Sequence, residues 1–443
     1  MTRNPSKGLK KLAKVSLRKS EVGSHKVFRD HGASLDVKIS RCDLVSKSGF
    51  PYVKFGDWLK YIVESDLLQN LVGTNDLKAM RSDLNLFWSR FQKSHPDHKM
   101  FDANEPGAPQ NHGMTIPVVV HGDEGRGRKK KQLMVLSVMG VLGEGSSRCN
   151  SKDGKGTAVD SERSLFLNMI GSTTLTHFLS CVLPIGLYNH TPEAYYQVLD
   201  LQAKEFATLF AHGVEVRGRT YYVSCIGVKG DAPYLAKTGQ FSRNFARKPT
   251  ASSSKKPCEG ICHQCDAGRE DLPHSVPFEQ IGVEEPVWLQ TVGLHDCAEL
   301  GSPFRQIPFE RDGTPGSFAK LFRYDLFHNV HLGVGKAFAS SAVCMVLELM
   351  EGYSIGDAFG KITEDFQSYC RSVQECPYHK RLTSSLFGVS SSFKDCPAGG
   401  WNKGDYTRLL LQWFQDYCDR NVIGKTTDPV YLLCVPALHL VPS

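Results

Sequence analysis

The stretch Tyr221-Tyr-Val-Ser-Cys-Ile-Gly-Val-Lys-Gly-Asp231 decides the fold class of this chain. Its β-branched and aromatic residues predict a buried strand, which runs into Gly230 and ends on the carboxylate of Asp231. A carboxylate in that place is held rigidly at the edge of a sheet, where a divalent metal can reach it. The stretch therefore predicts a strand that carries a candidate metal ligand, and a second carboxylate is expected on another strand.

A candidate partner strand lies upstream, where residues 114–123 read Met-Thr-Ile-Pro-Val-Val-Val-His-Gly-Asp. The apolar run 131–142 follows a basic turn, and two strands joined by a short loop predict a β-hairpin. A single Gly-Asp pair is a common turn. Two of them, each closing a predicted strand, favour Asp123 and Asp231 as a pair of metal-binding acids, and the alternative is that both are turn residues.

A helix is predicted between the two strands. Residues 165–188 supply further core, and Thr191-Pro-Glu193 is a typical helix start, with a capping hydroxyl, a proline in the first turn and an acid at the positive end of the dipole. Apolar side chains recur at helical spacing until Gly213, and the strand 220–228 follows. This order of elements matches the ribonuclease H-like arrangement, an α/β fold with a mixed sheet flanked by helices.

The chain is expected to divide into three parts joined by a turn-rich linker. Residues 1–50 are basic and polar with little periodicity, which predicts a mostly disordered or loosely attached arm. Residues 51–101 carry apolar side chains at helical spacing and predict a helical hairpin packed on the main domain. The linker is 102–113, and 114–443 forms the main domain, with a cysteine-containing insertion at about 240–320.

The composition is that of an ordinary soluble globular protein, with 41% hydrophobic and 22% charged residues among 443. The formal net charge is +7, and the first acid in the chain, Glu21, follows seven basic residues. Such a run can be a solvated tail, a nuclear-targeting or nucleic-acid patch, or a transit peptide. The 14 cysteines are scattered except at 258–265, which favours free thiols in a reducing compartment over a disulfide framework.

The segment 164–188 has no Asp, Glu, Lys or Arg and is long enough to span a bilayer. It also contains several polar residues and Pro184, which make it a poor apolar span. A buried strand and helix is therefore expected there, and no membrane partner.

The cysteine cluster Cys258-Glu-Gly-Ile-Cys262-His-Gln-Cys265 has the ligand spacing of a structural zinc site. Its fourth ligand is left open by the spacing, and the candidates are His263, His274, His295 and Cys297. A Cys-x-x-Cys pair can also be redox-active. The Lys- and Ser-rich flank favours an inserted zinc knuckle, for which we take His274 as the working fourth ligand.

Four motifs together resemble the catalytic region of eukaryotic DDE/D cut-and-paste transposases, above all the CACTA-type and related transposon-encoded proteins. They are the first Gly-Asp with its basic turn, the second Gly-Asp, the cysteine cluster, and Tyr324-Asp-Leu-Phe-His-Asn-Val-His331. The resemblance covers about 114–340, and Phe87-Trp-x-x-Phe91 looks like the pre-catalytic part of such proteins.

The resemblance implies a nuclear, DNA-binding transposable-element protein with a ribonuclease H-like fold, Mg²⁺ or Mn²⁺ at the acids, structural Zn²⁺ and self-association. Asp123 and Asp231 would be catalytic, Asp405 the third acid with Glu348 and Glu351 as competitors, and Asp325 and His328 would support them. Asp325 and His328 are expected on one face of a helix start, where a capping Asp and a buried His is the alternative. Contacts to DNA phosphates are expected from the basic turn, namely Arg126, Arg128, Lys129, Lys130 and Lys131.

Three functions remain open on these residues. One is metal-dependent cleavage and transfer of DNA strands. The second is a catalytically inactive, transposon-derived protein that binds DNA or protein, which the weak match of the third acid and the chain end within the apolar pattern 430–440 favour. The third is a zinc-dependent interaction module with no nucleic-acid role.

Overall fold

The structure, a computed structural model, describes residues 7–16, 20–105, 107–126, 131–145, 165–169, 172–244, 258–280, 282–294, 301–311, 313–325, 327–348, 350, 352–389 and 398–421. The chain forms two compact units, Met1–Arg323 and Tyr324–Ser443, which we call the first and the second unit. Residues of the expected arm, the helical region and the sheet pack together in the first unit. The domain boundaries expected from the sequence stay predictions.

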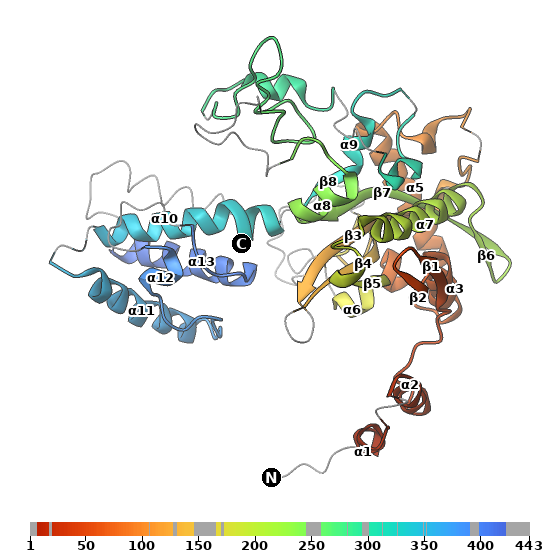
Figure 1. Ribbon diagram of the computed structural model, residues 1–443, viewed down its shortest axis with the longest axis horizontal. Helices are drawn as coiled ribbons and strands as arrows, with labels where there is room; N and C mark the ends of the chain where they lie inside the picture. The colour runs from red at the N-terminus through yellow and green to blue at the C-terminus, as the bar shows by residue number, and fades with distance from the viewer. Residues whose placement is uncertain are drawn as a thin grey trace. The chain divides into compact units, whose positions relative to one another are not determined.

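The first unit is built on a six-stranded mixed sheet with flanking helices (Figure 1). Its order is β5-β4-β3-β7-β6, and β8 also pairs with β7. Strand β3 is antiparallel to β4 and parallel to β7, and β4 is antiparallel to β5. The strands are β3 Thr115–Arg126, β4 Gln132–Gly140, β5 His177–Pro184, β6 Val214–Val216, β7 Arg219–Gly230 and β8 Phe322–Tyr324. The predicted α/β class, the hairpin of β3 and β4 and the strand β7 are confirmed.

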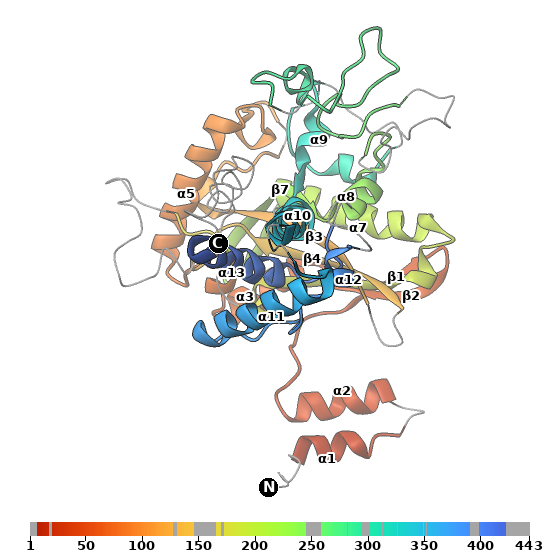
Figure 2. The same cartoon turned by 90° about the vertical axis from the view of Figure 1, so that its left-hand side faces the viewer.

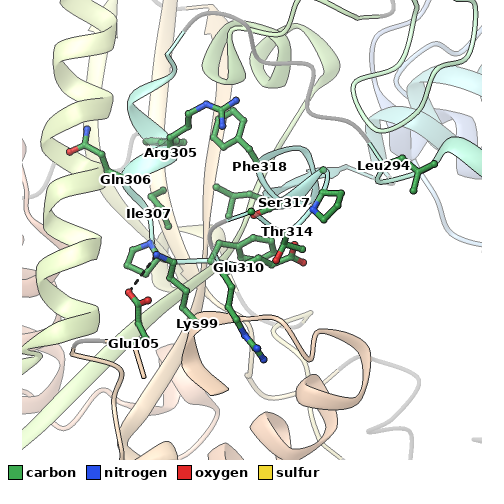
Figure 3. Close-up of a pocket in the computed structure, with 18 residues that line it drawn as sticks. Lys99, Glu105, Leu294, Arg305, Gln306, Ile307, Glu310, Thr314, Ser317 and Phe318 are labelled. Carbon is green, nitrogen blue, oxygen red and sulfur yellow. Dashed lines mark ion pairs between the residues drawn. The ribbon is translucent and has the colours of Figure 1, made fainter. Parts of the chain in front are cut away.

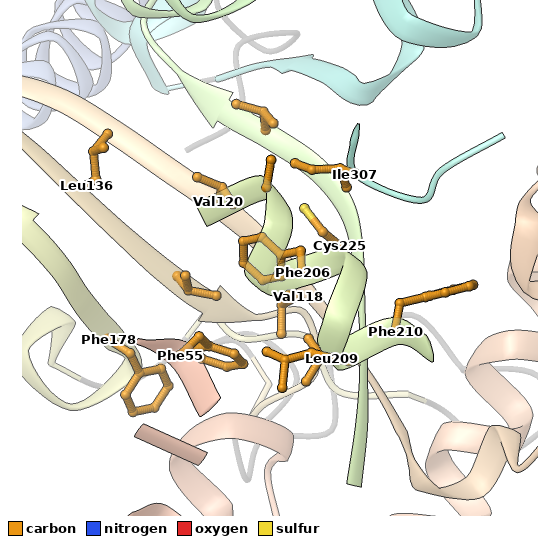
Figure 4. Packing of buried hydrophobic residues seen from close by; sticks show 14 of the residues in the cluster. Phe55, Val118, Val120, Leu136, Phe178, Phe206, Leu209, Phe210, Cys225 and Ile307 are labelled. Atoms are coloured by element: carbon orange, nitrogen blue, oxygen red, sulfur yellow. The ribbon is translucent and has the colours of Figure 1, made fainter. Parts of the chain in front are cut away.

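Apolar residues on one face of the sheet form the core, because alternate side chains of a strand point to the same face. Val118 and Val120 of β3 are fully buried there with Leu136 of β4 (Figure 4). Helix α7, Pro192–Ala211, packs Phe206 and Phe210 into the same core. The helix begins where the sequence predicted, but Thr191 makes no side-chain capping bond, so the expected capping hydroxyl is wrong.

Three helices before the sheet complete this core: α3 Phe55–Glu64, α4 Gln69–Val72 and α5 Leu77–Ser94. The Trp88 indole is fully buried and donates to the Thr115 carbonyl at the start of β3, 2.8 Å away. The helical region predicted from the sequence is therefore confirmed, and it belongs to the core of the sheet.

Residues 1–50 differ from the disordered arm that we expected. Strands β1 Ser40–Leu44 and β2 Lys47–Tyr52 form an antiparallel hairpin, and Leu44 and Phe50 are buried in the main core. Burial of these two side chains fixes the hairpin, and Cys42 and Tyr52 pack partly buried against the same core. Helices α1 Lys7–Ala13 and α2 Ser20–Asp30 lie side by side, and α1 buries no residue (Figure 2).

The region between β7 and β8 is the cysteine-containing insertion. It follows α8 Ala232–Gly239 and ends with α9 Ser317–Leu321. The short helical turns of the first unit are α6 Thr173–Thr176, η2 Lys99–Phe101, η3 His112–Met114, η5 Ile185–Leu187, η7 Val287–Thr291 and η8 Pro303–Gln306.

The second unit is helical in its described part and has a core of its own around Phe366, Trp401 and Trp413. Its elements are the π-helix η9 Phe327–Val334, α10 Gly335–Glu348, α11 Ile355–Ser372, α12 Ser384–Phe387 and α13 Gly404–Asn421. The segment Phe327–Glu348 is long and apolar enough to cross a membrane, a test that a buried core helix also passes. Many of its apolar residues, such as Val343 and Leu347, lie buried in that core.

Candidate functional site

The two Gly-Asp pairs lie side by side where the pairing of β3 with β7 ends. Asp123 is still inside β3, which continues to Arg126 and does not close on Gly-Asp as predicted, whereas Asp231 follows the end of β7. In the parallel pairing of β3 with β7, Gly122 is opposite Gly230, and the chain continues from them into Asp123 and Asp231. Neighbouring strands are about 4.8 Å apart, which is within reach of two carboxylates that share a ligand. The structure therefore brings together the two acids that the sequence paired.

The glycines of both pairs have a packing reason. The ring of Tyr234, in the first turn of α8, lies over Gly122 and Gly230 and is almost completely buried. A Cβ atom at Gly122 would lie 2.0 Å from Cε2 of this ring, and one at Gly230 would lie 2.3 Å from Cδ1. Because no carbon pair approaches so closely, only glycine fits at either position.

The two acids differ in their own contacts. Asp231 is the N-cap of α8, and its Oδ1 accepts a 2.8 Å hydrogen bond from the Tyr234 backbone N–H. Asp123 is half-buried, and its carboxylate forms no hydrogen bond or ion pair within the described residues. Capping of α8 thus explains an acid at position 231 even without a metal. The packing around Asp123 gives no such reason for an acid at position 123.

Glu124 ties the end of β3 to the helix that follows β7. Its Oε1 accepts from the Tyr188 hydroxyl at 3.1 Å and pairs with the Lys237 ammonium of α8. The ammonium also lies 5.0 Å from the centre of the Tyr188 ring. Burial, followed by the Glu124 charge, raises the pKa of the Tyr188 hydroxyl, which therefore stays protonated and keeps donating. This cluster holds the strand end that carries Asp123 against α8.

Basic side chains precede each acid on the same sheet face. His121 and Lys229 are opposite each other in the β3–β7 pairing, two positions before Asp123 and Asp231. His177 of β5 lies edge-on to the His121 ring, with 5.7 Å between ring centres. Burial and then the Lys229 charge lower the pKa of His177, so this ring is neutral at pH 7. The triplets His-Gly-Asp and Lys-Gly-Asp are the sequence pattern that could have identified His121 and Lys229.

The basic turn between β3 and β4 is only partly described. The backbone of Arg126 ends β3, and Lys131 is exposed just before β4. Arg128, Lys129 and Lys130 lie outside the described residues, so their expected contacts with phosphates stay predictions.

Two of the three clustered cysteines lie together. The Gln264 N–H donates to Cys262 Sγ at 3.3 Å, and a hydrogen bond with Cys262, followed by burial, raises the pKa of the Cys265 thiol. Cys258 is buried, and its backbone pairs with Glu270.

The expected zinc ligands are brought together only in part. Within the described residues no group of three or more His, Cys, Asp or Glu side chains could hold a metal ion. His274 is exposed and is not joined to the cysteines, and the buried His263 stacks on Phe241 with 4.4 Å between ring centres. His295 and Cys297 lie outside the described residues. A turn with two adjacent thiols and an N–H···S bond fits half of a zinc site.

The remaining candidate acids belong to the second unit. Asp325 is buried, accepts from the Phe327 N–H at 3.0 Å and pairs with His328 Nδ1 at 2.9 Å. The expected contact between the two side chains is present, whereas His328 is only partly buried, unlike the buried His of the alternative. Asp405 is exposed in the first turn of α13 and pairs with Arg408 at 2.8 Å.

Glu348 is exposed at the end of α10, and Glu351 lies outside the described residues. The identity of a third acid stays a prediction.

A cavity of about 660 Å³ lies elsewhere in the first unit, between η8, α9 and the loop that joins them (Figure 3). Its charged wall is largely paired internally, with Lys99 3.4 Å from Glu105 and the buried Glu310 3.3 Å from Lys320. The guanidinium of Arg305 lies over the Phe318 ring at 4.4 Å. These pairs leave the wall with little uncompensated charge to recognise a ligand.

No protein-family model matches this chain, and a search of curated proteins finds no relative. The functional argument therefore rests on the residues and geometry described above.

Proposed function

We propose that the first unit is a ribonuclease H-like domain, related to DDE/D transposases, that binds DNA and a divalent metal at Asp123 and Asp231. The observation that carries this proposal is the register of β3 and β7. Gly122 is opposite Gly230, so the two Gly-Asp pairs are neighbours where the pairing of these strands ends. The topology of the sheet supports the fold assignment. Strands β3, β4 and β5 form an antiparallel meander, and β7 is parallel to β3.

The donor set fits magnesium or manganese. These hard cations prefer carboxylate oxygens, and magnesium is commonly bound by one or two carboxylates together with waters and substrate phosphates. When bound, such a metal would activate a nucleophile and stabilise the leaving oxygen of a phosphodiester. Asp123 is the ligand that the chain leaves available, and Asp231 is held in place by its bond to the Tyr234 N–H.

The residues of the chain would bind and orient the DNA. Lys131 and the basic turn beside it would contact phosphates, which positions the strand without reading its sequence. His121 and Lys229 lie next to the acids and would help to balance the charge of the scissile phosphate. Glu124, Tyr188 and Lys237 would keep Asp123 in position by fixing the end of β3.

The test is nicking of supercoiled plasmid by the full chain with Mg²⁺ or Mn²⁺, together with Mn²⁺ binding measured by electron paramagnetic resonance. The variants are Asp123→Asn and Asp231→Asn, and Asp76→Asn is the matched control. Asp76 also caps a helix, accepting from the Lys78 and Ala79 N–H groups at 2.7 and 2.9 Å. Asparagine caps helices about as well as aspartate, so the changes at Asp231 and Asp76 both preserve capping capacity.

Loss of nicking and of Mn²⁺ binding in both site variants, with the control unchanged, is the expected result. Full activity and full Mn²⁺ binding in Asp231→Asn would refute the two-acid site.

The second candidate is a DNA-binding protein of the same fold that does not cut. Two observations favour this second candidate. Asp231 caps α8, and the described residues contain no group of three acids at the site. It predicts salt-sensitive DNA binding without cleavage in any metal, and DNA affinity that Asp123→Asn leaves unchanged. Nicking by the native chain would exclude it.

A further inference from the structure

A second pocket of the first unit lies at the opposite end of β7 from the two acids. It has a volume of about 470 Å³ and is lined by the ends of α3 and α7, the residue Lys38 and the start of β6. Val214 of β6 pairs with Tyr221 near the start of β7, and Asp231 follows the other end of that strand (Figure 1). At about 3.3 Å per residue, roughly 30 Å separates the pocket from the acids, so it is a different site.

The rim of this pocket is basic. Four lysines from three separate parts of the chain line it: Lys38, Lys54, Lys60 and Lys204. Lys204 pairs with Asp200 at 2.7 Å, and the Lys54 charge interacts with Glu205 on the floor of the pocket. Lys38 and Lys60 form no ion pair within the described part of the chain. Unpaired ammonium groups gathered around a cavity attract an anionic ligand, and phosphate is a group that lysine commonly binds.

The floor of the pocket carries two carboxyl groups. Glu205 of α7 accepts a 2.9 Å hydrogen bond from the Gly56 N–H and so caps α3, whose own N-cap residue, Lys54, has no side chain that can do so. Oδ2 of Asp57 is buried and has no hydrogen-bond partner in the structure as described. A buried acceptor without a donor is costly, and a ligand hydroxyl would supply that donor.

The charges of floor and rim are compatible with one ligand. Burial raises the pKa of Glu205 to about 7, which reduces the negative charge that an anion would meet there. Tyr52, Leu201 and Leu209 add apolar wall, and the volume lies in the range of small-molecule sites. Carboxylates that accept from ribose hydroxyls are a recurring feature of nucleotide sites.

We propose that this pocket binds a ribonucleoside phosphate, with its phosphates on the lysine rim and its ribose hydroxyls on Asp57. This goes beyond the proposed function, since it concerns another end of the sheet and a small ligand rather than DNA. The site needs neither Asp123 nor a divalent metal.

The experiment is isothermal titration calorimetry of the full chain with ADP in a chelator, so that no metal site contributes. Adenosine and 2′,3′-dideoxy-ADP are the comparison ligands, and inorganic phosphate tests for a site that recognises phosphate alone. Lys54→Gln with Lys60→Gln tests the rim, and Asp57→Asn tests the floor. Lys78→Gln with Lys93→Gln is the matched control, because both are exposed lysines of α5 outside the pocket.

ADP is expected to bind, and adenosine and dideoxy-ADP to bind at least about tenfold more weakly, because charged and hydroxyl contacts are lost. The rim variant should weaken ADP by about tenfold or more, and Asp57→Asn should weaken ADP but not dideoxy-ADP. The control and Asp123→Asn should bind as the native chain does.

The proposal is overturned if the native chain does not bind ADP at millimolar concentration. It is also overturned if the rim variant binds ADP as tightly as the lysine control variant does. Equal affinity for ADP and inorganic phosphate would overturn the nucleoside part and leave a phosphate site. Failure of this proposal would leave the metal and nicking tests at Asp123 and Asp231 untouched.

Discussion

The contact of Tyr234 with the two glycines predicts a large cost for the smallest possible substitution, Gly122→Ala. The added Cβ would lie 2.0 Å from Cε2, 2.3 Å from Cζ and 2.6 Å from Cδ2 of the ring. Ordinary carbon contacts begin near about 3.5 Å, so the ring would have to move by about 1.5 Å. Tyr234 is 1% exposed and cannot swing into solvent. We therefore expect the upper part of the overpacking range, about 3 kcal/mol.

Hydrogen exchange of peptides from β3 and β7, followed through a urea series, measures this cost in the first unit alone. The control is Gly125→Ala in the same strand, where a Cβ meets nothing within 4 Å. Alanine there should be neutral or stabilising by up to about 1 kcal/mol, since glycine in a strand loses more backbone entropy on folding.

The cause is tested by a double-mutant cycle. Tyr234→Ala alone should cost about 3–5 kcal/mol as a large-to-small core change. In that background Gly122→Ala has no ring to meet, so its additional cost should fall below about 1 kcal/mol. If Gly122→Ala is as harmless as Gly125→Ala, or if its cost is the same with and without the Tyr234 ring, the packing explanation of the Gly-Asp pairs is wrong.

Three further predictions concern other parts of the chain. Burial lowers the pKa of His98 to about 3, below its unfolded value of 6.5, so its stabilisation is present above pH 6.5 and is lost as the pH falls. Urea unfolding should therefore show a loss of about 2 kcal/mol between pH 7 and pH 5 that His98→Gln lacks. If Cys262 and Cys265 bind zinc, Cys265→Ser should remove the zinc measured by elemental analysis, whereas Cys418→Ser, in the core of the second unit, should not. Arg243→Met should cost about 3–5 kcal/mol in urea unfolding because it leaves the buried Asp266 without its main partner. Asp66→Asn, which breaks the exposed pair with Arg217, should cost less than about 1 kcal/mol.

The elements with strong patterns were predictable from the sequence. Strand β7 and the hairpin of β3 and β4 contain stretches rich in β-branched, aromatic or other apolar residues, and α7 has apolar residues at helical spacing over 20 positions. The hairpin of β1 and β2 was missed, because only Leu44 and Phe50 of its residues are fully buried and most of the others are polar. Cys42 and Tyr52 are partly buried against the same core.

The candidate site was predictable to a smaller extent. Two predicted strands, each closed by Gly-Asp, indicated Asp123 and Asp231 as candidates. The two acids are neighbours because β3 and β7 pair in parallel with Gly122 opposite Gly230. The role of Tyr234 depends on the direction in which α8 leaves β7, which no local pattern encodes. The contacts of Glu124 with Tyr188 and Lys237 join three distant segments and are equally invisible in the sequence.

The same geometry decides which acid gives the more informative experiment. The glycines are explained by the Tyr234 ring and Asp231 by its bond to the Tyr234 N–H, so half of the Gly-Asp repeat has a structural origin. Asp123 has no such origin, because it caps no helix and its carboxylate forms no hydrogen bond or ion pair with a described residue.

The Asp123→Asn variant should therefore fold as stably as the native chain, within about 0.5 kcal/mol, as surface substitutions usually do. If it also loses Mn²⁺ binding, the loss cannot be attributed to a disturbed fold, and Asp123 must be a metal ligand. If it binds Mn²⁺ as the native chain does, Asp123 is not a metal ligand. Asp231 then has no partner acid at the proposed metal site, and its role reduces to capping α8.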